Sequence, residues 1–290
     1  MSKLKKILNK RLRKFYLQRR VYKNANRERI AKRQANKIGK TEFSGKSILE
    51  KSPNLDEVNN LGYTKLGVLL NSEKVEKLVG ELNRLECFDP YRPELKRFKS
   101  NEVSPLTQVA NYKREDLVGI KEVLEIANDP KVLTFAQEFL GATPTISNIN
   151  AWWSFGEKEA AEQAQFFHRD VDDYKFIKLF FYLTDVEMEN GPHVYVESSS
   201  NDDHFKKIRR FSDAEIEETY GKDKIKYFTG KKGEAFFVNT YGIHKGLLPE
   251  KGKRLILQVQ YSINEVGVEN YVPQKNESNY NKYVNRLLIK

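Results

Sequence analysis

Cysteine is nearly absent from this sequence, since Cys87 is the one thiol among 290 residues. A single cysteine excludes an internal disulfide and a zinc site built from cysteine pairs. Such cysteine usage is typical of a reducing compartment. We therefore interpret Cys87 as a packing residue and expect a cytoplasmic protein.

Long apolar runs are also absent. No stretch approaches the length of about 20 apolar residues that a transmembrane helix needs, and no apolar segment follows the N-terminal charges as a secretory signal requires. Internal repeats and low-complexity segments are lacking as well. At 290 residues, 12% of them aromatic, the chain is expected to form one large folded domain with appendages.

Acidic residues are scarce only at the N-terminus. Residues 1–40 contain sixteen Lys or Arg and a single acid, Glu28, so this segment has a formal charge of +15. Because the whole chain carries +11, residues 41–290 carry −4. An argument from charge to an anionic partner therefore concerns only the N-terminal segment.

The same basic segment has a helical pattern. Residues 4–22 place Leu4, Leu8, Leu12 and Phe15 at helical spacing among cations, which predicts a basic amphipathic helix. We interpret the first 45 residues as an N-terminal extension. Its role stays open between a solvated or partly disordered segment, contact with an anionic membrane surface or acidic partner, nucleic-acid binding, and an organellar transit peptide.

Helices are predicted before residue 144. Residues 41–60 are polar and are expected to be a linker, after which a helix should run from Ser72, as its cap, to Leu85. A second helix is predicted over residues 115–126. A third has stronger boundaries, because Asp129 can cap it, Pro130 suits its first position and Gly141 can end it.

From Pro144 onward the pattern changes to short segments rich in β-branched and aromatic residues. Eight strands are predicted, and this number suits a mainly β fold with flanking helices, namely a double-stranded β-helix, the jelly-roll barrel of cupin-like proteins. They span residues 145–153, 163–168, 174–184, 193–197, 225–228, 234–239, 241–246 and 254–263.

The expected organisation is a domain over residues 46–270, with a helical cover at about 61–141 and a jelly-roll core at about 144–263. The charged residues 201–224 are expected to form a helix-like insertion in the core. The Asn-rich residues 271–290 are interpreted as a C-terminal extension.

Two of the predicted strands carry a metal-binding pattern. His168 and Asp170 are two residues apart, so both side chains would point to one face of a strand. His244, on a later strand, is the candidate third ligand. Two histidines and one carboxylate form the facial triad that holds non-haem Fe(II) and leaves coordination positions open. Arg254, ten residues after His244, suits a bidentate contact with a carboxylate.

At these residues the chain resembles the phytanoyl-CoA dioxygenase-like family of Fe(II)/2-oxoglutarate oxygenases, over about Leu61 to Ile263. The likeness also includes the segments 61–85, 129–141 and Asn190-Gly191-Pro192. In two places the sequence departs from the family. Glu197-Ser198-Ser199-Ser200 replaces a common Pro-Gly-Ser-His, and Gly246 stands where many relatives have a hydroxyl residue near 2-oxoglutarate.

The resemblance implies that His168, Asp170 and His244 hold Fe(II) and that Arg254 binds the distal carboxylate of 2-oxoglutarate. With O2 as the second co-substrate, a small molecule would be hydroxylated at a C–H bond, with release of succinate and CO2. Gln165, Trp152 and Tyr182 are candidates for lining the co-substrate pocket.

Other polar residues near the motif are assigned simpler roles. His193 is expected to be a structural histidine and His204 a surface residue. Asp172 and Asp173 are expected in a solvated loop.

Two other functions remain open. The basic N-terminus suggests a nucleic-acid dealkylating dioxygenase, but that class usually has a second arginine six residues after the co-substrate arginine, and here Gln260 occupies that position. A non-catalytic jelly-roll binding protein would be expected to have lost ligands, whereas all four key residues are present. We therefore expect a small-molecule substrate rather than nucleic acid, and the sequence does not define an oligomeric state.

Overall fold

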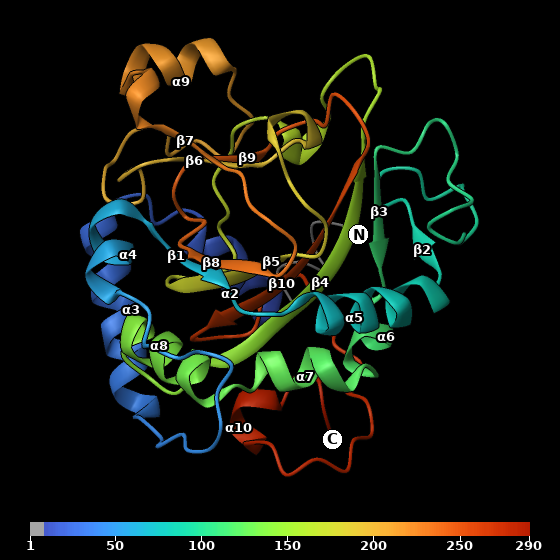
Figure 1. The fold of residues 1–290 in the computed structure, drawn as a ribbon. Coiled ribbons are helices and arrows are strands. Elements are labelled where there is room, and N and C mark those ends of the chain that lie inside the picture. The colour runs from blue at the N-terminus through green and yellow to red at the C-terminus, as the bar shows by residue number, and fades with distance from the viewer. Residues whose placement is uncertain (1–8) are drawn as a thin grey trace.

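The computed structural model describes residues 9–290 and shows two antiparallel sheets with flanking helices (Figure 1). Seven strands form one sheet in the order β1-β8-β5-β10-β4-β3-β2, and three form a second sheet in the order β7-β6-β9. This arrangement confirms the predicted mainly β, cupin-like fold. The strands are β1 (Tyr63–Val68), β2 (Cys87–Phe88), β3 (Val109–Tyr112), β4 (Thr145–Phe155), β5 (Phe176–Tyr182), β6 (His193–Val196), β7 (Ile225–Phe228), β8 (Glu234–Val238), β9 (His244–Gly246) and β10 (Lys253–Ser262).

Helices cover one face of the larger sheet, and the smaller sheet lies on its other side, with α9 beyond it (Figure 1). The covering helices share one hydrophobic core with the outward side chains of the larger sheet. The helices are α2 (Lys10–Gln18), α3 (Asn24–Ile38), α4 (Leu55–Leu61), α5 (Ser72–Arg84), α6 (Arg114–Val118), α7 (Lys121–Ala127), α8 (Pro130–Leu140), α9 (Asp213–Tyr220) and α10 (Lys282–Asn285).

Some predicted boundaries hold because the capping chemistry is local. Asp129 accepts hydrogen bonds from the backbone N–H groups of Lys131 and Val132, and Gly141 ends α8 with a φ of 78°. The start of α5 is close to the prediction, but Asn71 rather than Ser72 caps it. The signals that succeeded therefore need only a few neighbouring residues.

Three local predictions were wrong. The single helix expected over residues 115–126 is divided at Gly119 and Ile120 into α6 and α7. The predicted linker contains α4, which begins after the capping residue Asn54. The strand predicted over residues 163–168 is not formed: a 3-10 turn at Gln163–Gln165 is followed only by isolated bridges at Phe167 and His168. A reciprocal capping box between Glu162 and Gln165 stabilises that turn.

The N-terminal segment packs on the domain. Leu4 and Leu8 of the predicted helix lie outside the described residues, but α2 buries Phe15, and Ala31 and Ala35 of α3 join the main hydrophobic core. The guanidinium of Arg27 is buried and donates to the carbonyl oxygen of Asp173. The described part of this segment is therefore not the solvated extension that the charge pattern suggested.

The C-terminal residues pack in a similar way, since Val284 and Leu288 belong to the same core. Separate extensions at residues 1–45 and 271–290 thus stay a prediction about domain boundaries. Within residues 9–290, every helix is too short or too polar to cross a bilayer.

Candidate active site

The two motif histidines lie side by side. His168 and His244 form an antiparallel bridge, in which each backbone N–H donates to the other carbonyl oxygen at 2.9 and 3.0 Å. Residues directly opposite each other in such a pair place their side chains on the same face. Their ring centroids are accordingly 4.3 Å apart, although 76 residues separate them in the sequence.

Backbone carbonyls orient both imidazole rings. The Nδ1 of His168 is 2.9 Å from the carbonyl oxygen of Phe166, and the Nδ1 of His244 is 2.9 Å from that of Gly242. A carbonyl oxygen only accepts, so each Nδ1 carries the donating proton and each Nε2 keeps its lone pair. This is the arrangement by which proteins prepare histidine for a metal ion.

Asp170 completes the group. Its Oδ1 lies 3.6 Å from Nε2 of His168, and its Oδ2 lies 3.4 Å from Nε2 of His244. Ligand atoms that share one ion at about 2.1 Å are about 3 Å apart, so these separations suit a common metal. One ligand atom from each of the three residues lies within 4.8 Å of the others. Two nitrogens and one oxygen, facing a cavity, suit Fe(II).

The protonation states also favour ligation. Burial and the neighbouring His244 lower the pKa of His168 to about 3, so this imidazole is neutral at physiological pH. Burial alone would raise the pKa of Asp170, but the nearby Lys178 and His244 outweigh burial and hold that pKa well below its usual range. The group therefore presents a neutral imidazole and a carboxylate without first releasing protons.

Lys178 is a polar residue of the site that the sequence analysis missed. It lies on β5 with its side chain buried, and its Nζ is 2.7 Å from Asp170 Oδ2 and 3.5 Å from Asp172 Oδ2. The available signal was a lysine within the otherwise apolar run Phe176–Tyr182. Because Asp172 pairs with Lys178 and Asp173 is buried against Asn264, the expectation of a solvated loop was wrong.

Arg254 lines the same cavity, and its guanidinium is only partly hydrogen-bonded. Only 3% of the residue is exposed, and its Nη2 donates to Ser154 Oγ at 3.1 Å. Its Nε and Nη1 have no hydrogen-bond partner among the described residues. A buried guanidinium without an acid requires an anion, and the fork of N–H groups suits a carboxylate such as that of 2-oxoglutarate.

The departure at Gly246 has a steric reason. A Cβ at this position would lie 3.1 Å from Nη2 of Arg254, and the neighbour would have to shift. Ser154, on the adjacent strand β4, supplies a hydroxyl beside Arg254 instead.

One cavity of about 220 Å³ joins these groups, and both sheets contribute to its wall. Trp152 and Gln165 line this cavity, as the sequence analysis expected, together with the three motif residues and Arg254. Tyr182 differs from its prediction, because it does not line the cavity. Its hydroxyl donates to the carbonyl oxygen of Phe228 at 2.6 Å and accepts from the backbone N–H of His193.

His193 faces the cavity rather than a structural partner. Its ring stacks near that of His244, with centroids 5.6 Å apart, and its buried Nε2 has no hydrogen-bond partner among residues 9–290. Burial lowers the pKa of His193 well below its ordinary value. The expected satisfied structural histidine is therefore not observed, whereas His204 is exposed as predicted.

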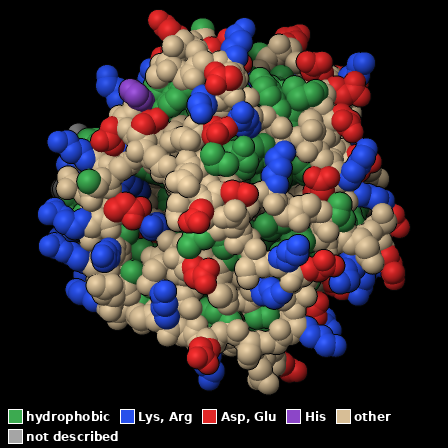
Figure 2. Space-filling model, turned by 60° about the vertical axis from the view of Figure 1, so that its left-hand side comes forward, with side chains coloured by type: hydrophobic (Ala, Val, Ile, Leu, Met, Phe, Trp, Pro, Cys, Tyr) green, Lys and Arg blue, Asp and Glu red, His purple; other side chains and the backbone are tan. Residues whose placement is uncertain are grey.

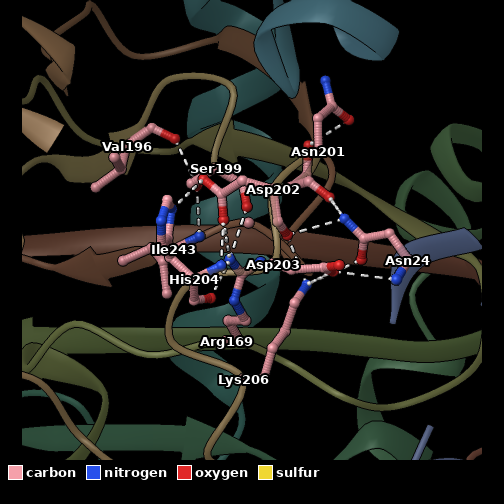
Figure 3. A network of polar contacts seen from close by, with 12 residues as sticks. Asn24, Arg169, Val196, Ser199, Asn201, Asp202, Asp203, His204, Lys206 and Ile243 are labelled. Carbon is pink, nitrogen blue, oxygen red and sulfur yellow. Dashed lines mark hydrogen bonds and ion pairs between the residues drawn. The ribbon is translucent and has the colours of Figure 1, made fainter. Parts of the chain in front are cut away.

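A second polar network surrounds Arg169, the residue between His168 and Asp170. The guanidinium of Arg169 donates to the carbonyl oxygen of Tyr241. It also donates to that of Ser199 and pairs with Asp202 at 3.2 Å (Figure 3). Asn24, at the start of α3, donates to two carbonyl oxygens of the same loop (Figure 3). Helix α3 thus contacts, through Asn24, the loop of residues 199–204 that also binds Arg169.

Several solved structures have a similar fold. HygX from Streptomyces hygroscopicus, with nickel, 2-oxoglutarate and hygromycin B bound, is 16% identical with a TM-score of 0.53, covering 79% of this chain and 92% of that chain. SnoN, a non-haem alpha-ketoglutarate-dependent epimerase from nogalamycin biosynthesis, is 16% identical with a TM-score of 0.51, covering 72% and 81%. SnoK, a carbocyclase of the same biosynthesis, is 13% identical with a TM-score of 0.52, covering 75% and 86%. At these identities the likeness shows the fold.

A comparison with curated proteins gives no match. The sequence itself matches the phytanoyl-CoA dioxygenase (PhyH) family over residues 58–247, which include His168, Asp170 and His244. This match spans more than half of the chain, and the fold and the ligand geometry agree with it. The chain belongs to the phytanoyl-CoA dioxygenase family.

Proposed function

We propose that this protein is a non-haem Fe(II)/2-oxoglutarate-dependent dioxygenase that hydroxylates a C–H bond of a small molecule. His168, Asp170 and His244 would hold the iron, and Arg254 would bind 2-oxoglutarate. One observation carries the proposal: a prepared His-Asp-His group and an incompletely paired, buried arginine face the same cavity. Iron with 2-oxoglutarate would supply the oxidising power by coupling decarboxylation of the co-substrate to O2 reduction.

The residues of the chain orient the reactants and exclude water. Arg254 and Ser154 fix one end of the co-substrate, because a bidentate guanidinium restricts the rotation of a carboxylate. Trp152 and Ile256 form an apolar wall next to this anchor. Gln165 places its unpaired amide nitrogen at the cavity and is available to either reactant.

Hydroxylation is the proposed outcome among several that this fold supports. Similar folds include an epimerase and a carbocyclase, so the fold alone does not select the reaction. HygX holds hygromycin B, which favours a small-molecule substrate here. Nucleic-acid dealkylation is disfavoured because Gln260, at the position of the expected second arginine, donates to Ser147 and is buried in the sheet.

Anaerobic titration of the reduced protein with Fe(II) and 2-oxoglutarate tests the proposal. A weak visible charge-transfer band should appear only when both are present, and in air the protein should release succinate. Asp170→Ala removes a ligand and should lose the band, whereas the exposed Asp203→Ala serves as the matched control. A folded wild-type protein without the band at saturating ligand would support the non-catalytic binding protein.

We also propose that the N-terminal helices contact an anionic membrane surface. Residues 9–40 carry exposed Lys and Arg that form no ion pair with a described acid, including Arg13, Arg20, Arg29, Arg33 and Lys37. Lys and Arg side chains gather along the left edge of the face shown in Figure 2. Leu17 and Tyr22 are exposed in the same segment, and such apolar side chains among cations suit a membrane interface.

Vesicle sedimentation tests this contact. Vesicles with anionic phospholipid should bind the full chain at low salt and release it as salt screens the charges. The triple variant Arg29→Glu/Arg33→Glu/Lys37→Glu, on one face of α3, should bind much less. Its control reverses three exposed lysines elsewhere, Lys51→Glu/Lys96→Glu/Lys207→Glu. Equal binding by both variants would contradict the assignment to α3.

A further inference from the structure

We infer that the cavity beside the metal group takes a neutral, polyhydroxylated substrate of the carbohydrate class. This inference rests on the proposed function and names the substrate class for the same site. It is carried by four side-chain amides that line one cavity, those of Asn111, Asn150, Gln165 and Gln258. Three of them have no hydrogen-bond partner in the described chain, and Gln165 lacks a partner at its Nε2.

Two of these amide residues are buried, Asn111 and Asn150 are partly buried, and none of the four is fully satisfied by the described chain. Gln258 is 5% exposed and Gln165 is 6% exposed. The side chains of Asn111, Asn150 and Gln258 form no hydrogen bond with another described residue, and the Nε2 of Gln165 is buried without a partner. An amide that a bound ligand covers without pairing costs about 1–3 kcal/mol, so a ligand that pairs with several of them gains affinity and selectivity.

The amides are separated from the co-substrate anchor. In the β4 and β10 pairing, Asn150 lies opposite Gln258, whereas Arg254 lies opposite Ser154. Four residues along a strand correspond to about 13 Å, so the Asn150 and Gln258 pair lies well beyond the carboxylate site. Asn111, on β3, is registered with Trp152. Asn150 and Gln258, with Asn111 beside Trp152, therefore form a polar floor for a second molecule next to an aromatic ring.

Amide chemistry selects hydroxyl groups. Asn111, Asn150 and Gln258 each offer an N–H donor and a carbonyl acceptor, and Gln165 offers its N–H donor. A hydroxyl can satisfy either kind of group, whereas a fatty acyl chain would pair with none of them. The ring of Trp152 offers an apolar face for the C–H face of a sugar ring, which adds contact without requiring charge.

The charged side chains that line the cavity each have a partner in the chain or a proposed role at the co-substrate. Lys178 pairs with Asp170 and Asp172, and Arg254 is reserved for the carboxylate of the co-substrate. No other Lys, Arg, Asp or Glu lines the described cavity. A charged group on the substrate would therefore find no unpaired counter-charge on this floor, which favours a neutral molecule.

Succinate release by the Fe(II)- and 2-oxoglutarate-loaded protein in air tests the inference. The probes are two panels of similar size: methyl glycosides of hexoses and 6-deoxyhexoses, and straight-chain acyl compounds of six to twelve carbons. Glycosides should raise succinate release above the rate without added substrate. If acyl compounds do so instead, or if no glycoside does, the inference is overturned.

Two nearly volume-conserving variants locate the effect. Gln258→Met and Asn150→Leu should each raise the half-saturating glycoside concentration roughly tenfold, because each removes a hydrogen-bonding amide. Asn36→Leu, at an exposed position on α3, makes the same change as Asn150→Leu away from the cavity and should leave it unchanged. An equal rise in the 2-oxoglutarate requirement would assign the amides to the co-substrate and contradict the inference.

The test separates this inference from the proposed function. Succinate release without added substrate, together with the charge-transfer band, reports on the oxygenase assignment alone. If both are present and glycosides have no effect, only the substrate class is wrong. If both are absent in folded protein, the oxygenase assignment itself fails.

Discussion

The two faces of the larger sheet use the same strands for different purposes. On β10, Leu255, Leu257 and Val259 point outward into the core shared with the helices. Arg254 and Gln258 alternate with them and point to the cavity. Both faces are almost completely buried, so exposure to water does not explain the difference in polarity.

A buried polar face is costly unless something other than water satisfies it. The outward face is satisfied by apolar packing. The cavity face holds amides, an arginine and a lysine, of which only the lysine has full ionic partners within the described chain. The comparison teaches that the outward residues maintain the fold, whereas the inward residues are those to which we assign the proposed metal, co-substrate and substrate.

Neighbouring substitutions on β10 give the largest expected contrast. Leu257→Ala removes a fully buried side chain from the outer face and should lower the free energy of unfolding by about 2–5 kcal/mol. Gln258→Ala should change it by less than about 1 kcal/mol, because its amide has no protein partner to lose. Urea unfolding measures both. Equal losses would remove the distinction between the faces.

Arg254→Met tests the cavity face by function. The co-substrate would lose a charge-assisted contact of about 1.5–3 kcal/mol, so its dissociation constant should rise roughly 10- to 150-fold. The free energy of unfolding should not fall by a similar amount, because an incompletely paired buried charge is removed. Lys253→Met is the matched control on the exposed neighbour. An unchanged requirement for 2-oxoglutarate would place the co-substrate elsewhere.

Lys178→Met tests whether the lysine positions the metal carboxylate. Without the 2.7 Å contact, Asp170 can rotate, and metal affinity should fall roughly tenfold, as is typical when the partner of a ligand is lost. Cobalt(II) titration of the reduced protein measures this. Lys175→Met, at the half-exposed lysine that pairs with Glu28, is the control. Tighter metal binding by Lys178→Met would show that its charge repels the ion more than its contact orders Asp170.

Much of the fold was predictable because its signals are local or periodic. The strands from residue 145 onward follow runs of β-branched and aromatic residues, and the ends of α8 follow from Asp129 and Gly141. The packing of α2 and α3 was not predictable from charge. Their buried faces are small, and they depend on distant partners, such as the carbonyl oxygen of Asp173 for Arg27.

The site residues also divide into those that the sequence predicted and those that it did not. The spacing of His168, Asp170, His244 and Arg254 was visible in the sequence, and the structure brings these residues to one cavity. Lys178 and the amides of Asn111, Asn150 and Gln258 were not recognised, because single polar residues in strands indicate neither their face nor their partners. Tyr182 was misplaced for that reason, since only the structure shows its hydroxyl bonded to Phe228 and His193.

The pH dependence of the metal-free protein compares a buried with an exposed histidine. Burial lowers the pKa of His168 to about 3, against about 6.5 in the unfolded chain. Between these values the unfolded state binds a proton that the folded state does not, so stability rises with pH. The contribution is fully present above about pH 6.5 and is lost as pH falls toward 3. Urea unfolding in chelator from pH 7 to 4 should therefore show a shallower pH dependence in His168→Gln than in wild type, whereas His204→Gln, at an exposed position, should follow wild type. An identical slope in His168→Gln would mean that another group controls the acid sensitivity.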